Sequence, residues 1–148
     1  LIADEPTTAL DVTIQAQILD LILRLKERFK MAMILITHDL GIIAKSAQRV
    51  VVMYAGVKVE EADVESLFEN PSHPYTMALM RSLPVLGRKE KFLQEIKGVV
   101  PPPYRDITGC KFADRCPEVI GQCYKESPKL TQINKGHVVA CIRRTKNG

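Results

Sequence analysis

Two short apolar runs separated by a long amphipathic helix largely determine how this chain can fold. Residues 1–3 and 31–36 are continuously apolar, as expected of parallel strands that are buried on both faces. Between residues 12 and 30 the apolar side chains recur at near-helical spacing, and Asp11 is the predicted N-cap. Strand, helix and strand in this order predict a βαβ unit, so we expect an α/β fold.

Further elements are predicted downstream of this unit. The pattern indicates a helix over residues 40–47, a β-hairpin with strands at 49–54 and 58–61, and helices at 64–68 and 74–83. Beyond Gly87 the pattern weakens, apart from a short helical stretch at 90–96. Three consecutive prolines at 101–103 exclude both a helix interior and a central strand.

Charge and cysteine content divide the chain near residue 84. Residues 1–84 carry 8 of the 21 Lys and Arg side chains and 11 of the 17 Asp and Glu side chains, a net charge of −3. Residues 85–148 carry a net charge of +7 and contain all four cysteines. We therefore expect an α/β domain over residues 1–84 and a small, irregular, cysteine-rich extension over 85–148.

The hydropathy of the chain and its first residues bear on its cellular location and on how much of a protein it represents. No apolar run approaches the roughly 20 residues that span a bilayer, and no signal peptide is recognisable, which predicts a cytoplasmic protein. The sequence opens on Leu1, inside the first predicted strand. We interpret it as the C-terminal piece of a longer protein, and we expect the truncated sheet edge to favour self-association.

Polar side chains follow both predicted parallel strands. Asp4 and Glu5 come after the first strand, and Thr37, His38 and Asp39 after the second. In parallel sheets the chemistry lies at the carboxyl ends of strands, so one carboxylate could hold Mg²⁺ through water and the other could act as a base. A nearby histidine could bind a phosphate oxygen. In the alternative interpretation these side chains only cap a turn and a loop.

The sequences of these two segments resemble known ATPase motifs. Residues 1–11, LIADEPTTALD, resemble the Walker B and D-loop segment of ABC-type ATPases, and residues 36–41, ITHDLG, resemble their switch-histidine loop. The resemblance implies a P-loop ATPase fold in which Asp4 organises Mg²⁺ through water and Glu5 is the general base for ATP hydrolysis. It further implies that His38 senses the γ-phosphate and that Asp11 contacts a second ATPase subunit, identical or different.

Other motifs of such ATPases do not occur in the sequence. No G-x-x-x-x-G-K-[ST] loop is present, nor a Gln loop, nor the Leu-Ser-Gly-Gly signature. We therefore expect this chain to represent the C-terminal part of the ATPase and to be inactive on its own.

From residue 49 onward, the chain resembles the ATP-binding subunits of the oligopeptide/dipeptide branch of ABC transporters. The segments that carry the resemblance are 49–56, 59–61, 70–76, 109–112, 115–117 and 136–141, with Ala62 standing where that branch usually has Gly. It implies an ATP-binding subunit at the inner face of the cell membrane. That subunit would work with membrane permeases to import oligopeptides or dipeptides delivered by a binding protein. For residues 70–75 we favour a helix-start motif without a ligand.

The four cysteines follow the spacing Cys110-x5-Cys116-x6-Cys123-x17-Cys141. Disulfides are disfavoured in a reducing cytosol, whereas four thiolates suit either zinc or an iron–sulfur cluster. Some members of the resembling branch hold a four-iron cluster at these cysteines, so the resemblance favours that ligation, with unligated thiols as a further alternative. His137 is a candidate substitute ligand, although we expect it to be a surface histidine.

Two other functions fit parts of the sequence. One is a non-transport ABC ATPase whose metal-bound tail contacts nucleic acid, and the other is a metal-stapled binding module with a vestigial ATPase remnant. The cations of residues 85–148 lack aromatic stacking partners, so a solvated surface is favoured and no nucleic acid is expected.

Overall fold

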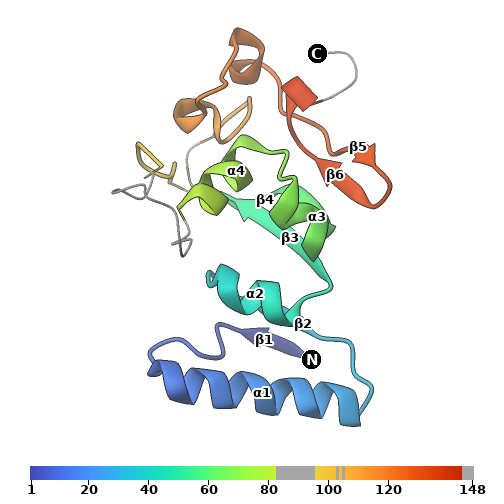
Figure 1. The fold of residues 1–148 in the computed structure, drawn as a ribbon. Coiled ribbons are helices and arrows are strands. Elements are labelled where there is room, and N and C mark those ends of the chain that lie inside the picture. Colours follow the sequence, from blue (N-terminus) through green and yellow to red (C-terminus); the bar gives the residue numbers. More distant parts are fainter. Residues whose placement is uncertain (83–95, 103, 105, 145–148) are drawn as a thin grey trace, which may run out of the picture. The chain divides into compact units, whose positions relative to one another are not determined.

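A computed structural model describes residues 1–82, 96–102, 104 and 106–144 (Figure 1). The chain forms two compact units, residues 1–47 and residues 48–148. Each unit has its own sheet and is described separately below.

The first unit is the predicted βαβ arrangement. Strand β1 (Ile2–Asp4) leads into helix α1 (Val12–Arg28), which is followed by strand β2 (Ile34–Ile36) and helix α2 (Leu40–Ser46). The two strands pair in parallel, with Ala3 opposite Leu35. Asp11 caps α1 as predicted, because its carboxylate accepts hydrogen bonds from the backbone N–H groups of Thr13 and Ile14.

The second strand is shorter than its apolar run. Two residues beyond the end of helix α1, Lys30 is in the left-handed region, at a φ of 49°, and the N–H of Met31 donates to the carbonyl of Lys26. These contacts close the helix C-terminus and keep the start of the apolar run out of the strand. Strand pairing therefore begins at Ile34.

The second unit begins with the predicted hairpin. Strands β3 (Arg49–Tyr54) and β4 (Val57–Asp63) are antiparallel and are joined at Ala55 and Gly56, which have φ values of 47° and 80°. Both residues are in the left-handed region that a two-residue hairpin turn requires. Helices α3 (Val64–Glu69) and α4 (Pro74–Arg81) follow.

The end of the chain extends the same sheet, which the sequence did not predict. Strands β5 (Thr131–Asn134) and β6 (His137–Val139) form a second hairpin, and the strand order is β3-β4-β6-β5. Each strand is too short for its hydrophobic alternation to be recognised. Between the hairpins the described chain forms short 3₁₀ helices at Ala113–Arg115 and Gly121–Tyr124, with a third at Ile142–Arg144.

The core of the second unit unites both parts of the sequence. Its fully buried side chains include Leu67 from α3, Phe112 from the segment of the first cysteine, and Val139 from β6. The expected boundary at residues 84–85 and most of the predicted helix at 90–96 lie outside the described residues. Within the described ranges, no helix is both long and apolar enough to cross a membrane.

Candidate functional site

The first candidate site lies at the carboxyl ends of β1 and β2. Because the two strands are parallel, Asp4–Glu5 and Thr37–His38 emerge at the same edge of the sheet. The N–H of Glu5 donates to the carbonyl of Ile36 at 2.9 Å, which joins the two strand ends. The backbone alone therefore brings Glu5 close to His38.

The Glu5 carboxylate is held at both oxygens. Nδ1 of His38 lies 3.1 Å from Oε1, and the hydroxyl of Thr8 donates to Oε2 at 2.8 Å. The Thr8 hydroxyl, followed by His38, holds the pKa of Glu5 below its usual value, so the carboxylate stays ionised. Glu5 has a φ of 42°. Sequence reasoning singled out Glu5 and His38 but not Thr8, whose hydroxyl could have been recognised three residues after a candidate base.

The other candidate residues occupy neighbouring positions in this unit. Asp4 is exposed at the end of β1 and pairs in register with Ile36. Asp11 uses its carboxylate to cap α1, and Asp39 caps α2 in the same way. Asp39 also accepts a hydrogen bond from the side-chain amide of Gln15 at 3.2 Å, which links α1 to the loop after β2.

The second candidate site is a pocket lined by all four cysteines, which are free thiols. Cys123 and Cys141 are buried, and Cys110 and Cys116 are half-buried. Burial raises the pKa of the Cys116 thiol to about 11, and burial likewise raises the pKa values of the Cys110 and Cys141 thiols. Repulsion from the neighbouring cysteines adds to each increase, because all four thiols line the same pocket.

Hydrogen bonding from nearby backbone groups opposes the effect of burial on three of the thiols. The backbone of Phe112 and Ala113 lowers the pKa of Cys110, that of Glu118 lowers the pKa of Cys116, and that of Arg143 and Arg144 lowers the pKa of Cys141. Such hydrogen bonds stabilise negative charge on sulfur and are common around iron–sulfur clusters.

Gly109 allows two of the cysteine segments to meet. The N–H of Cys110 donates to the carbonyl of Cys123 at 2.7 Å. A Cβ atom at residue 109 would lie 2.3 Å from that carbonyl oxygen and 2.7 Å from the carbonyl carbon of Tyr124. Only glycine permits this close approach of two backbones.

The fit of a metal to this pocket depends on the kind of metal centre. Among the described residues, no group of three or more His, Cys, Asp or Glu side chains is arranged to hold a single metal ion. A zinc ion requires every sulfur atom about 2.3 Å from one centre. A four-iron cluster takes one thiolate on each iron, so its sulfur ligands stand farther apart. Among the described residues, the four cysteines line one pocket without forming a single-ion site.

His137 corrects a prediction made from the sequence. We expected a surface histidine or a substitute metal ligand, but the residue is 3% exposed and lies on β6. Its Nε2 atom is 2.7 Å from Oε1 of Glu60, which is completely buried on β4. The prediction was wrong because β6 and its pairing with β4 were not foreseen.

The segment 70–75 starts a helix, as predicted. Pro74 occupies the first turn of α4, and Nδ1 of His73 accepts from the N–H of Tyr75 at 3.1 Å. His73 also lines the four-cysteine pocket. Burial lowers the pKa of His73 to about 4, so the ring is neutral at physiological pH.

The middle of the chain matches a known protein family. Residues 59–123 match the family model described as "Oligopeptide/dipeptide transporter, C-terminal region". This region includes most of β4, all of α3 and α4, and the first three cysteines.

Curated relatives extend the likeness to nearly the whole chain. A probable peptide ABC transporter ATP-binding protein of Sinorhizobium fredii is 57% identical over 97% of this chain and 43% of its own length. The oligopeptide transport ATP-binding protein AppD of Bacillus subtilis is 48% identical over 100% of this chain and 45% of its own. The dipeptide transport ATP-binding protein DppD of Escherichia coli is 48% identical over 95% and 43%. The predicted resemblance to ATP-binding subunits of oligopeptide and dipeptide ABC transporters is confirmed, and the chain spans less than half the length of these relatives.

Proposed function

We propose that this chain supplies the hydrolytic residues of the ATP-binding subunit of a peptide-importing ABC transporter. The observation that carries the proposal is the contact of Glu5 with His38 at the carboxyl edge of two parallel strands. The names of the curated relatives support peptide transport as the process that this ATPase drives.

The geometry suggests a role for each side chain in hydrolysis. Glu5 is kept ionised by its two hydrogen bonds, so it can accept the proton of an attacking water. His38 lies beside it and would orient that water and the γ-phosphate. Asp4, one residue before Glu5, would hold Mg²⁺ through water, and Mg²⁺ neutralises charge on the transferring phosphate.

The proposed subunit works in an assembly. Asp11 and the loop before it would contact a second ATPase subunit, identical or different, with ATP between the two. Membrane permeases would bind the pair at the inner face of the cell membrane, and a peptide-binding protein would deliver the cargo. In this proposal residues 1–84 are the ATPase part and residues 85–148 the cysteine-rich extension.

The decisive experiment replaces Glu5 by Gln in the complete ATP-binding subunit that carries this sequence. ATP binding should be retained, while turnover should fall by a factor of about 10² to 10⁴ because the proton acceptor is lost. Glu27→Gln, at an exposed position of α1, is the matched control and should leave turnover unchanged. Unchanged turnover in Glu5→Gln would refute the general-base role.

We further propose that the four-cysteine pocket holds an iron–sulfur cluster, with zinc as the alternative. Four thiolates in one pocket repel one another, so a cationic centre would stabilise them. The backbone hydrogen bonding that lowers the pKa of three of the thiols supports the cluster, since hydrogen bonds to sulfur tune such centres. The cluster would stabilise the cysteine-rich extension by cross-linking its segments.

Anaerobic purification tests this second proposal. The chain should absorb near 400 nm (roughly, as expected for iron bound to cysteine thiolates) and should contain iron and sulfide. Cys123→Ser should lose the absorbance, whereas Lys125→Gln, an exposed change two residues further on, should retain it. A colourless protein that contains zinc would contradict the cluster.

A further inference from the structure

We propose that the turn at Ser72 and His73 assembles the four-cysteine pocket before any metal binds, with His73 and Arg144 as positioning residues. The inference extends the proposed cluster site, but it concerns the arrangement of the thiols in the metal-free chain. It can therefore stand or fail independently of the cluster itself.

The turn is fixed to the sheet by a buried carboxylate. Oε1 of Glu60 accepts from the N–H of Ser72 at 2.7 Å, and Oε2 accepts from the N–H of His73 at 2.9 Å. His137 approaches the same carboxylate at 2.7 Å, from β6. Because Glu60 is completely buried, its carboxylate must be hydrogen-bonded by these protein donors instead of by water. The turn is therefore held in one well-defined position.

The ring of His73 reaches two of the cysteine segments from this fixed turn. Because Nδ1 accepts from Tyr75, the neutral ring carries its hydrogen on Nε2. The ring lines the same pocket as Cys141. The ring also packs against Phe112, two residues after Cys110, with ring centroids 5.8 Å apart.

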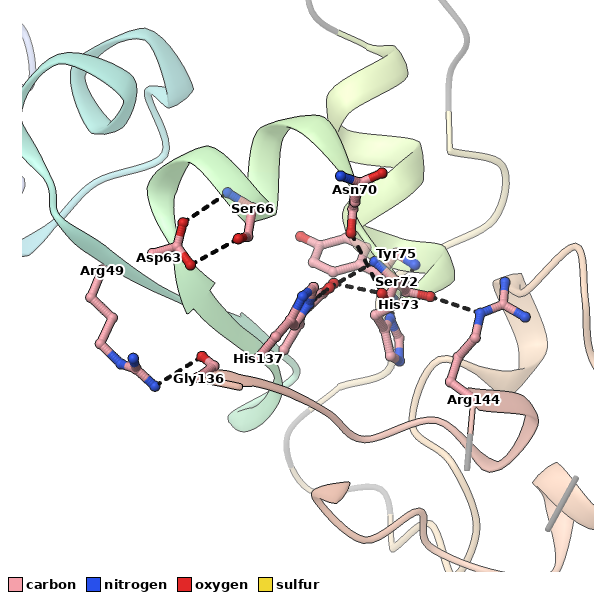
Figure 2. A network of polar contacts seen from close by, with 11 residues as sticks. Arg49, Asp63, Ser66, Asn70, Ser72, His73, Tyr75, Gly136, His137 and Arg144 are labelled. Carbon is pink, nitrogen blue, oxygen red and sulfur yellow. Dashed lines mark hydrogen bonds and ion pairs between the residues drawn. The ribbon is translucent and has the colours of Figure 1, made fainter. Parts of the chain in front are cut away.

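Arg144 connects the turn to a third cysteine segment. Its Nε atom donates to the carbonyl of Ser72 at 3.1 Å (Figure 2). Its Nη2 atom donates to both carboxylate oxygens of Glu118, at 2.9 and 2.8 Å. Glu118 is two residues after Cys116 and lines the same pocket. The guanidinium thus links the turn to the segments that carry Cys116 and Cys141.

The fourth cysteine is joined through the first. Cys123 accepts the backbone hydrogen bond of Cys110 described above, so the placement of one segment sets the other. All four thiols are therefore connected to a single turn whose position depends on β4. This differs from small metal domains that fold only when the metal binds.

Thiol alkylation of the reduced, metal-free 148-residue chain tests the inference. In His73→Asn the new side chain can still cap α4, since Asn is a good N-cap, but it is too short to replace the ring contacts. We expect the alkylation of Cys141 and Cys110 to accelerate by about tenfold, while helix content is retained. Arg144→Gln should accelerate Cys116 and Cys141 to a similar extent.

Ser72→Ala is the matched control. Within the described part of the chain, the Ser72 hydroxyl makes one hydrogen bond, to the carbonyl of Asn70 at 3.5 Å. The backbone groups of Ser72 that bind Glu60 and Arg144 are unchanged in this variant. Its thiols should react at the wild-type rate. If His73→Asn does not fold, Arg144→Gln still decides the matter. Unchanged alkylation in Arg144→Gln, or thiols that already react freely in the metal-free wild type, would overturn the inference.

Discussion

Nε2 of His137 lies 2.7 Å from Oε1 of Glu60, although 77 residues separate the two in sequence. Their side chains are 4% and 0% exposed. The contact joins β6 to β4, and the same carboxylate holds the turn before α4 through two backbone N–H groups. One buried carboxylate thus connects the hairpin at the start of the second unit with the hairpin at its end.

Breaking this pair should destabilise the chain strongly. His137→Ala leaves the Glu60 carboxylate buried with one partner fewer, so we expect the free energy of unfolding to fall by about 3–5 kcal/mol. Chemical denaturation measures the change. Glu65→Gln, at an exposed position of α3, is the control and should have an effect within about 0.5 kcal/mol. A loss below about 1 kcal/mol for His137→Ala would show that the pair contributes little.

The hydroxyl of Thr76 offers a change in the opposite direction. Thr76 is completely buried in α4, and its Oγ1 atom has no hydrogen-bond partner in the described part of the chain. Thr76→Val replaces the hydroxyl by a methyl group of similar size and removes the cost of burying it. We expect the free energy of unfolding to rise by about 1 kcal/mol.

Thr76→Ser provides the matched comparison for this site. It retains the unsatisfied hydroxyl and deletes the methyl group, so it should be less stable than the wild type by about 1 kcal/mol. If the valine variant is the less stable of the two in thermal and chemical unfolding, the hydroxyl has a partner.

Glu61 should make stability depend on pH in acid. Lys58 donates to its carboxylate at 2.7 Å and Arg49 approaches the other oxygen, and these contacts lower the pKa of Glu61. A carboxyl whose pKa is lowered by folding stabilises the chain fully at pH values above its ordinary pKa of 4.5. This stabilisation is lost as the pH falls from there through the pKa of Glu61 in the folded chain. Glu61→Gln should therefore lose at most about 1 kcal/mol near pH 7 and nothing at low pH. Denaturant titration of both proteins at each pH measures the difference. Equal destabilisation of the variant at pH 7 and in strong acid would contradict the predicted pH dependence.

The parts of the structure that were predictable are local in sequence. The βαβ unit followed from two apolar runs and one amphipathic helix, and the Asp11 cap lies beside the helix that it starts. The hairpin at β3 and β4 was indicated by the turn residues Ala55 and Gly56. In each case the decisive interaction connects residues a few positions apart or follows from parallel strand geometry.

The parts that were missed depend on long-range contacts. β6 has three residues and becomes a strand only because β4 offers a free edge. His137 is polar and was expected at the surface, because its partner Glu60 is 77 residues away. The convergence of four cysteines was foreseen from their number, but the turn that connects their segments was not. No local pattern encodes such pairings.

Under the proposed role of Glu5 as the general base of ATP hydrolysis, Thr8 should set the lower pH limit of turnover. Its hydroxyl donates to Oε2 of Glu5 at 2.8 Å and is the largest cause of the lowered pKa of Glu5, ahead of His38. Since the base must be ionised to accept a proton, a lower pKa extends activity to more acidic pH. Thr8→Val removes the hydroxyl while keeping the shape, so the pKa of Glu5 should rise toward 4.5.

The expected result is a shift of the acidic limb of the turnover profile to higher pH in Thr8→Val, with turnover near neutral pH reduced by less than about tenfold. Thr8→Ser keeps the hydroxyl and should retain the wild-type profile, which separates the hydrogen bond from the packing of the threonine methyl. The measurement requires the complete ATP-binding subunit, assayed for phosphate release across the acidic range at saturating ATP. A valine variant whose acidic limb coincides with that of the serine variant would show that Thr8 does not act on the charge of Glu5.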